Sequence, residues 1–127
     1  MKAIELYDYY TEGGTRTQSV EKIFLSLQTD SVRLLSILGS ELESFNEILS
    51  QSKKTEYPKW FQQKTGVYLL FFEMTDIMNN NHRVYLCYDN SIIDIDDGIM
   101  YIVEDINHQQ WLRSFQEKYR GNNLSWY

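Results

Sequence analysis

The sequence predicts an α+β fold for a single domain, residues 1–127, in which a four- to five-stranded, mainly antiparallel sheet packs against two N-terminal helices and one C-terminal helix. Residues 67–104 hold four apolar runs separated by three short clusters of turn-forming residues, a pattern typical of a β-meander. Apolar residues at helical spacing precede and follow this stretch. A chain of 127 residues, of which 43% are hydrophobic, has the size of one globular domain.

The N-terminal part is expected to form one short strand and two helices. Residues 3–7 alternate apolar and polar side chains, which favours a strand. Residues 18–28 and 31–52 carry apolar side chains three and four positions apart, and the polar segment 29–31 between them supplies capping residues. Gly39 falls inside the longer helix, where it suggests the close approach of another element. The apolar stripe of this helix predicts a core face against the sheet in a monomer, with a dimer seam as the alternative.

The central and C-terminal parts are expected to form the sheet and the last helix. Residues 53–65 are polar and contain the only proline, so they are predicted to link helix to sheet. Residues 67–74 are apolar on both alternating faces, which predicts a central strand covered on both sides. Shorter alternating runs follow and are expected to pair as antiparallel neighbours. Asn107 is expected to cap a helix that ends near Tyr119.

The negative charge of the chain is concentrated in one segment. The formal net charge is −6, from 18 acidic and 12 basic residues. Residues 84–112 carry six acidic side chains and no Lys or Arg, whereas the acidic and basic residues elsewhere balance. The whole excess therefore lies on the second half of the meander and on the segment that leaves it. Such a concentration of one sign of charge favours a basic partner.

A two-residue type I′ turn at Asp97 and Gly98 would set the register of the last hairpin. In that register one face is apolar, and Asp94 and Asp96 share the other face with Tyr101 and aliphatic residues. Carboxylates around an aromatic centre indicate a contact face for a basic protein; an outer strand whose charges deter edge pairing is the alternative. The predicted partner-binding residues are Asp89, Asp94, Asp96, Asp97, Tyr101, Glu104 and Asp105.

No sequence pattern indicates a catalytic, metal or cofactor site. The spacing around Gly98 does not fit a calcium loop, because isoleucines occupy positions that need oxygen ligands. His82 and His108 have no Cys or acidic residue at ligand spacing, so no zinc site is expected. Asp94 and Asp96 on one strand face leave open an alternative, a magnesium site in a metal-dependent enzyme.

Other classes of protein are disfavoured by composition. The acidity and the scattered basic residues oppose direct nucleic-acid binding, and the chain contains no nucleotide-binding or hydrolase motif. No apolar run approaches the roughly 20 residues that a membrane helix needs, and the N-terminus lacks the features of a signal peptide. The single cysteine, Cys87, excludes an internal disulfide and is expected to be a small core residue. A cytoplasmic protein without cofactor or membrane contact is therefore expected.

The chain resembles bacterial toxin-immunity proteins of the contact-dependent growth inhibition type. The likeness covers its general character: a small acidic domain rich in Ile, Asn and Tyr, with helices before an antiparallel sheet and a closing helix that contains the run 111–115, WLRSF. The resemblance implies tight binding to one cognate toxin domain, often a basic nuclease, whose active site or nucleic-acid surface the immunity protein covers. We therefore expect a stoichiometric inhibitor and not an enzyme. Another acidic interaction module or a DNA-mimic inhibitor is the alternative.

Overall fold

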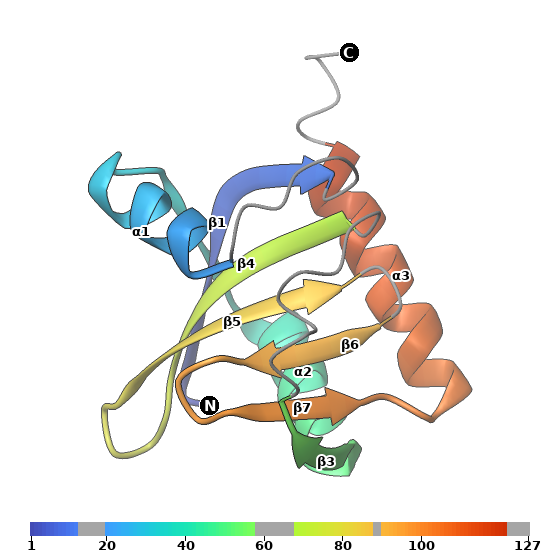
Figure 1. Ribbon diagram of the computed structural model, residues 1–127. Helices are drawn as coiled ribbons and strands as arrows, with labels where there is room; N and C mark the ends of the chain where they lie inside the picture. Colours follow the sequence, from blue (N-terminus) through green and yellow to red (C-terminus); the bar gives the residue numbers. More distant parts are fainter. Residues whose placement is uncertain (13–19, 58–67, 88–89, 122–127) are drawn as a thin grey trace.

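The computed structural model describes residues 1–12, 20–57, 68–87 and 90–121, and it contains one seven-stranded antiparallel sheet with three helices (Figure 1). The strand order is β2-β1-β4-β5-β6-β7-β3. The strands are β1 (Ala3–Glu12), β2 (Leu34–Ile37), β3 (Lys53–Glu56), β4 (Tyr68–Thr75), β5 (Asn81–Cys87), β6 (Ser91–Asp94) and β7 (Ile99–Ile102). The helices are α1 (Val20–Thr29), α2 (Gly39–Gln51) and α3 (Ile106–Gly121).

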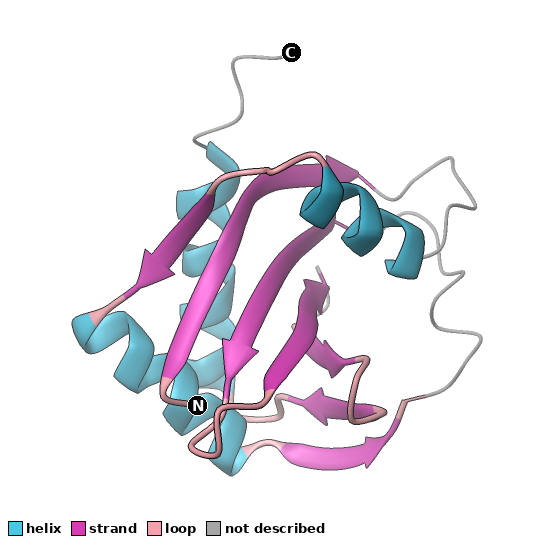
Figure 2. Cartoon of the chain, turned by 90° about the vertical axis from the view of Figure 1, so that its left-hand side faces the viewer, coloured by secondary structure: helices cyan, strands magenta, loops and turns pink. Residues whose placement is uncertain are grey.

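The sheet separates two apolar cores, because successive side chains of a strand point to opposite faces. Phe72 of β4 faces α2 and α3, where it meets Phe45 and Phe115, while its neighbour Phe71 faces α1 and meets Phe24. Figure 2 shows α1 on the opposite side of the strands from the other two helices. The expected central strand at 67–74 is confirmed by β4, which is buried on both faces.

The predicted helix 31–52 is wrong in its first third. Residues Leu34–Ile37 form the edge strand β2, which pairs with β1, and α2 begins only at Gly39. Gly39 has a φ of +61°, a left-handed conformation that starts the helix at a bend, so this glycine does not lie inside a longer helix. A short apolar run satisfies either element by pattern, and pairing with β1 decides for the strand.

The predicted strand count is also wrong, because the segment expected to be a linker contributes a strand. Lys53–Glu56 forms β3, which pairs antiparallel with β7 and closes the second edge of the sheet. All four side chains of β3 are exposed, so this strand carries no apolar pattern by which it could be recognised. The rest of the expected linker, residues 58–65, lies outside the described part of the chain.

The last hairpin has a longer loop than the type I′ turn predicted. Asp94 pairs with Ile99 and Ile93 pairs with Met100, so residues 95–98 form a four-residue loop. The Oδ1 atom of Asp94 accepts hydrogen bonds from the backbone N–H groups of Asp96 and Asp97, at 3.1 and 3.0 Å. This local capping by the Asp94 side chain favours the wider loop. The partner of each strand residue shifts by two positions, which keeps Asp94 and Tyr101 on one face and Ile93 and Met100 on the other. Asp96, which was predicted to share the face of Asp94, lies in the loop instead.

Helix α3 confirms the predicted C-terminal helix, but its cap differs. The Oδ1 atom of Asp105 accepts hydrogen bonds from the backbone N–H groups of Asn107 and His108, so Asp105 caps the helix in place of Asn107. The rings of Trp111 and Phe115 stack at 5.2 Å on the core side of the helix. None of the helices in the described residues is long and apolar enough to cross a membrane.

Candidate functional site

The most unusual arrangement of side chains surrounds His82 on β5. Its ring is buried, with 6% of the residue exposed, and each ring nitrogen contacts a carboxylate. Nδ1 lies 2.9 Å from Oδ2 of Asp94, and Nε2 lies 2.8 Å from Oδ2 of Asp76. A third carboxylate, that of Asp97, places Oδ2 3.6 Å from Nδ1. We call these four residues, His82, Asp76, Asp94 and Asp97, the His82 cluster.

Two hairpins bring the His82 cluster together. The β4–β5 turn holds Asp76, whose Oδ1 accepts hydrogen bonds from the backbone N–H groups of Met78 and Asn80. Asp94 ends β6, where it pairs with Val84, a near neighbour of His82 on the adjacent strand. The following loop is tied back to β5 by the hydrogen bond from Ile95 N–H to the carbonyl oxygen of Arg83, at 3.0 Å. This bond keeps the loop that carries Asp97 over β5.

The chemistry of the contacts requires a positive charge or a shared proton in the cluster. Ionised carboxylates only accept hydrogen bonds, so both ring nitrogens of His82 must present a proton to them. Burial lowers the pKa of His82, but the hydrogen bond that its ring donates to Asp76 and the charges of Asp94 and Asp97 outweigh this effect, so the pKa of His82 is raised. The His82 hydrogen bond and that of Asn80 N–H lower the pKa of Asp76 to about 2. Burial raises the pKa of Asp94.

Asp96 is held by a separate partner. The Arg83 guanidinium contacts both carboxylate oxygens of Asp96 through Nε, and Nη2 lies 2.7 Å from Oδ1. The backbone N–H of Arg83 donates a further hydrogen bond to Oδ2 at 2.7 Å. Burial by itself raises the pKa of Asp96, but the hydrogen bonds from Arg83 and its charge lower the pKa by a larger amount. The pKa of Asp96 therefore lies below its usual value. Asp94 and Asp96 are therefore not available together for a shared magnesium ion.

The structure divides the seven residues that were predicted to bind a partner. Asp94 and Tyr101 are buried, with 1% and 9% exposed, because the face that carries them is covered by α2 and α3. The apolar residues on that face thus belong to the core. Asp89 lies outside the described residues, and Asp96 is paired with Arg83. The exposed members of the set that remain are Asp97, Glu104 and Asp105.

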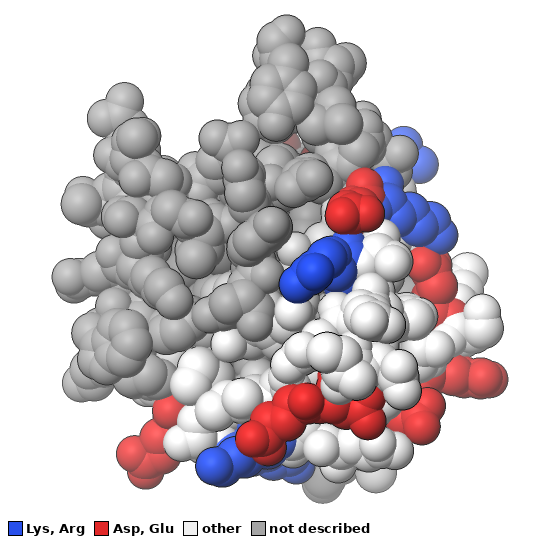
Figure 3. Space-filling model, turned by 90° about the vertical axis from the view of Figure 1, so that its right-hand side faces the viewer, with Lys and Arg blue, Asp and Glu red and all other residues white. Residues whose placement is uncertain are grey.

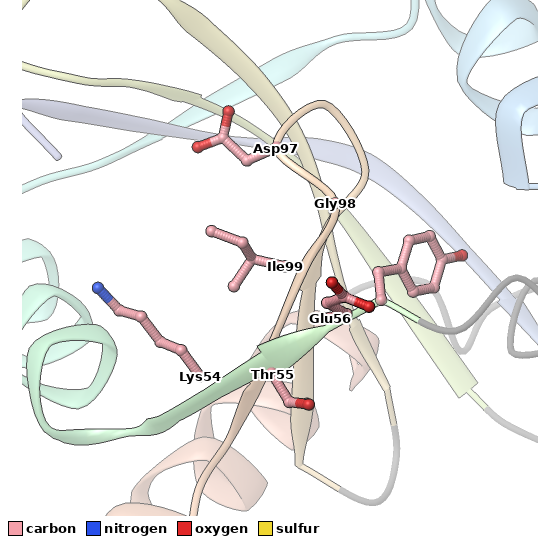
Figure 4. A pocket seen from close by; sticks show the side chains of 7 residues that line it. Lys54, Thr55, Glu56, Asp97, Gly98 and Ile99 are labelled. Atoms are coloured by element: carbon pink, nitrogen blue, oxygen red, sulfur yellow. The ribbon is translucent and has the colours of Figure 1, made fainter.

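An open hollow of about 580 Å³ adjoins the loop that carries Asp97 (Figure 4). It lies where β3 meets β7, and Figure 4 shows the side chains of Lys54, Asp97 and Ile99 on the same side of the strands. The Lys54 ammonium is 5.7 Å from the centre of the Tyr101 ring, a cation–π distance. Both signs of charge line this hollow, which does not favour a simple anionic or cationic small molecule.

Sequence reasoning missed the His82 cluster because its members are separated along the chain. Asp76 precedes His82 by six positions, and Asp94 follows it by twelve. A signal for the first contact was present: the hairpin places Thr75 opposite Asn81 and Met74 opposite His82, so Asp76 and His82 are diagonal neighbours on one face of the two strands. The contact with Asp94 depends on the register of β5 with β6, which the spacing of turn residues did not fix. Spacing along the sequence therefore did not reveal that carboxylates contact both nitrogens of His82.

Comparison of the chain with protein-family models, with curated proteins and with solved structures finds no match. The chemistry of the site therefore has to be argued from its own geometry. His82 is buried, and each of its ring nitrogens contacts a carboxylate. The accessible chemistry of this end of the molecule is that of the exposed carboxylates.

Proposed function

We propose that this protein is an immunity protein, a stoichiometric inhibitor that binds a cognate bacterial toxin domain with nuclease activity through exposed carboxylates around β7. The observation that carries the proposal is that Asp97, Glu104 and Asp105 stay exposed although two other predicted contact residues are buried. Carboxylates on such a surface take the place of the nucleic-acid phosphates that a basic nuclease binds. Their charge speeds association and makes it sensitive to salt.

The arrangement of these carboxylates fits a contact surface of ordinary size. Asp97 lies just before β7 and Glu104 just after it, and a chain of seven residues spans at most about 23 Å. An interface of about 800 Å² per partner is wide enough to cover both ends of this strand. Glu56 of β3 pairs with Ile99 beside Asp97 and adds a further exposed carboxylate. Figure 3 shows acidic side chains along the lower and right-hand margins of the face that includes α3.

An apolar side chain lies among the carboxylates at the start of α3. Ile106 is 65% exposed and follows Glu104 and Asp105 directly in the chain. Protein interfaces commonly place such an apolar residue inside a rim of charged ones, where the charges orient the partner and the apolar contact slows dissociation. This feature supports a protein partner over a free ion, because a small ion would gain nothing from Ile106.

The proposal is tested with three tagged versions of the protein, used to capture partners from the native bacterium at low and at high salt. The first is the wild type, and the second carries Asp97→Asn, Glu104→Gln and Asp105→Asn. Asparagine at position 105 retains the capping oxygen of α3, so the fold is preserved. The third is a control with the same loss of charge on helix surfaces, Glu43→Gln, Glu47→Gln and Glu117→Gln, all exposed in the wild type.

The expected result is one stoichiometric partner that binds the wild type and the control alike. At low salt, this partner should bind the variant that carries Asp97→Asn, Glu104→Gln and Asp105→Asn more slowly and more weakly. The captured partner must then be toxic when expressed alone and be neutralised by an equimolar amount of this protein. A partner that is not toxic would favour another acidic interaction module or a DNA mimic. Equal binding by all three versions would reject the proposed surface, and the absence of any partner would reject the inhibitor function.

A further inference from the structure

Two carboxylates approach the same nitrogen of the buried His82 ring, and one proton on that nitrogen cannot serve both well. Oδ2 of Asp94 lies 2.9 Å from Nδ1, and Oδ2 of Asp97 lies 3.6 Å from the same atom. His82, Asp94 and Asp97 each offer one atom that could bind a metal ion, and these three atoms lie within 4.8 Å of one another. With Asp76 on the other ring nitrogen, three carboxylates surround a single imidazole, so the cluster has an excess of negative charge.

The spacing of these three atoms suits a small divalent cation. Zinc binds imidazole nitrogen and carboxylate oxygen at about 2.0–2.2 Å, so tetrahedral ligands lie about 3.3 Å apart. The observed separations of 2.9 and 3.6 Å lie on either side of that value. The two carboxylate oxygens lie within 4.8 Å of each other, and bringing them to about 3.3 Å would place Nδ1 and both oxygens around one ion. An imidazole ligand also favours zinc over magnesium or calcium, which take oxygen ligands.

The surrounding hydrogen bonds orient the donor atoms as outer-sphere partners do in zinc sites. Asp76 accepts from Nε2 of His82, which leaves Nδ1 as the nitrogen that faces Asp94 and Asp97. The backbone N–H groups of Asp96 and Asp97 bind Oδ1 of Asp94 and so turn Oδ2 toward the ring. The Asp97 side chain is 49% exposed, which gives an ion and its fourth ligand, a water molecule, a route from solvent.

We propose that His82, Asp94 and Asp97 form a binding site for a zinc-class divalent cation, with Asp76 as the outer carboxylate that orients the ring. The ion would join β5 to the loop between β6 and β7, and so fix the position of the segment that carries Asp97. Asp97 belongs to both this site and the proposed contact surface, but this inference does not rest on the proposed inhibitor function, because it concerns the chain without a partner.

The site is tested on full-length protein freed of metal with a chelator and then titrated with zinc, magnesium or calcium chloride. Zinc is expected to bind with 1:1 stoichiometry in calorimetry and to raise the unfolding temperature, whereas magnesium and calcium at the same concentration change neither. Asp97→Asn removes one proposed ligand at an exposed position and is expected to weaken zinc binding. Asp76→Asn removes the outer carboxylate and keeps the Oδ1 acceptor of its turn, and it is expected to weaken zinc binding about 10–100-fold.

Two controls separate this site from incidental binding. Asp30→Asn removes one exposed carboxylate at the end of α1, and His108→Gln removes the only other histidine of the chain. Both should bind zinc as the wild type does, and circular dichroism should show that every variant is folded. Nitrogen-detected NMR of the His82 ring should show Nδ1 bound to zinc and Nε2 still protonated.

Three results would overturn the proposal. One is the absence of saturable 1:1 zinc binding, and another is binding that Asp97→Asn and Asp76→Asn leave unchanged. The third is a His82 ring that stays protonated on both nitrogens in excess zinc at neutral pH, which would assign the cluster to a proton alone. Since none of these readouts involves a partner protein, failure of this inference is distinguishable from failure of the proposed function.

Discussion

The pair formed by His82 and Asp94 provides the sharpest test of the electrostatics of the cluster. Asp94 is 1% exposed, and its Oδ2 faces the His82 ring. Replacing His82 with leucine removes the positive charge and leaves a buried carboxylate without a counter-charge. Breaking a buried ion pair in this way costs about 3–5 kcal/mol of the free energy of unfolding.

The partner substitution, Asp94→Asn, should be milder. Asparagine keeps the oxygen that accepts from the N–H groups of Asp96 and Asp97, and its amide can donate to a neutral His82 ring. Only the charged part of the interaction is lost, at a cost of about 1 kcal/mol. In the double variant no buried charge remains, and an unpaired asparagine amide costs about 1–3 kcal/mol. The double variant should therefore be more stable than the sum of the single effects implies.

The measurement is urea unfolding at pH 7 in the presence of a chelator, followed by circular dichroism for the wild type, both single variants and the double variant. The expected coupling energy is about 3 kcal/mol, well above the roughly 0.5 kcal/mol within which independent sites add. Additive effects, or a His82→Leu variant that loses less than about 1 kcal/mol, would refute the view that the two side chains form a buried charged pair.

Three further predictions concern the rest of the fold. Phe45 is fully buried against Phe72, Trp111 and Phe115, so Phe45→Ala should lower the free energy of unfolding, measured in urea, by about 3–5 kcal/mol. A truncation of the exposed Leu25 should change it by less than about 0.5 kcal/mol. Burial and the hydrogen bond to Glu73 raise the pKa of Tyr7 above 10.0, so as the pH rises the unfolded chain releases this proton before the folded chain does. The free energy of unfolding should therefore fall above pH 10 by up to about 1.4 kcal/mol per pH unit. Thermal unfolding of Tyr7→Phe should show a smaller decline over the same pH range. Gly98 has a φ of +67° with open space around it, so Gly98→Ala should cost about 1–2 kcal/mol through backbone strain alone, and an unchanged unfolding midpoint would contradict this.

The sequence predicted elements whose pattern depends on burial, and it missed those that depend on pairing between distant segments. β4 was recognised because apolar side chains lie on both faces, and α3 because its apolar residues follow helical spacing. Leu34–Ile37 and Lys53–Glu56 are strands only because β1 and β7 supply their hydrogen-bond partners. No local pattern carries that information.

The same reason explains which parts of the candidate site were predicted. The concentration of carboxylates was visible in the sequence, and four of the seven residues predicted for contact are exposed, namely Asp96, Asp97, Glu104 and Asp105. Alternation placed Asp94 and Tyr101 on one face correctly but does not reveal that α2 and α3 cover that face. The His82 cluster combines a turn, a strand and a loop, so it follows from the sheet register and not from residue spacing.

The strand order has a consequence for how the sheet opens. Its two edges, β2 and β3, belong to one continuous segment, Leu34 to Glu56, whose middle is α2. A helix of 13 residues is about 20 Å long, and with its flanking residues it crosses the roughly 29 Å or less between the two edges of a twisted seven-stranded sheet. Detachment of α2 from the core would therefore release both edges at once. We expect the amide groups of β2 and β3 to exchange with solvent as one cooperative unit, although they lie at opposite ends of the sheet.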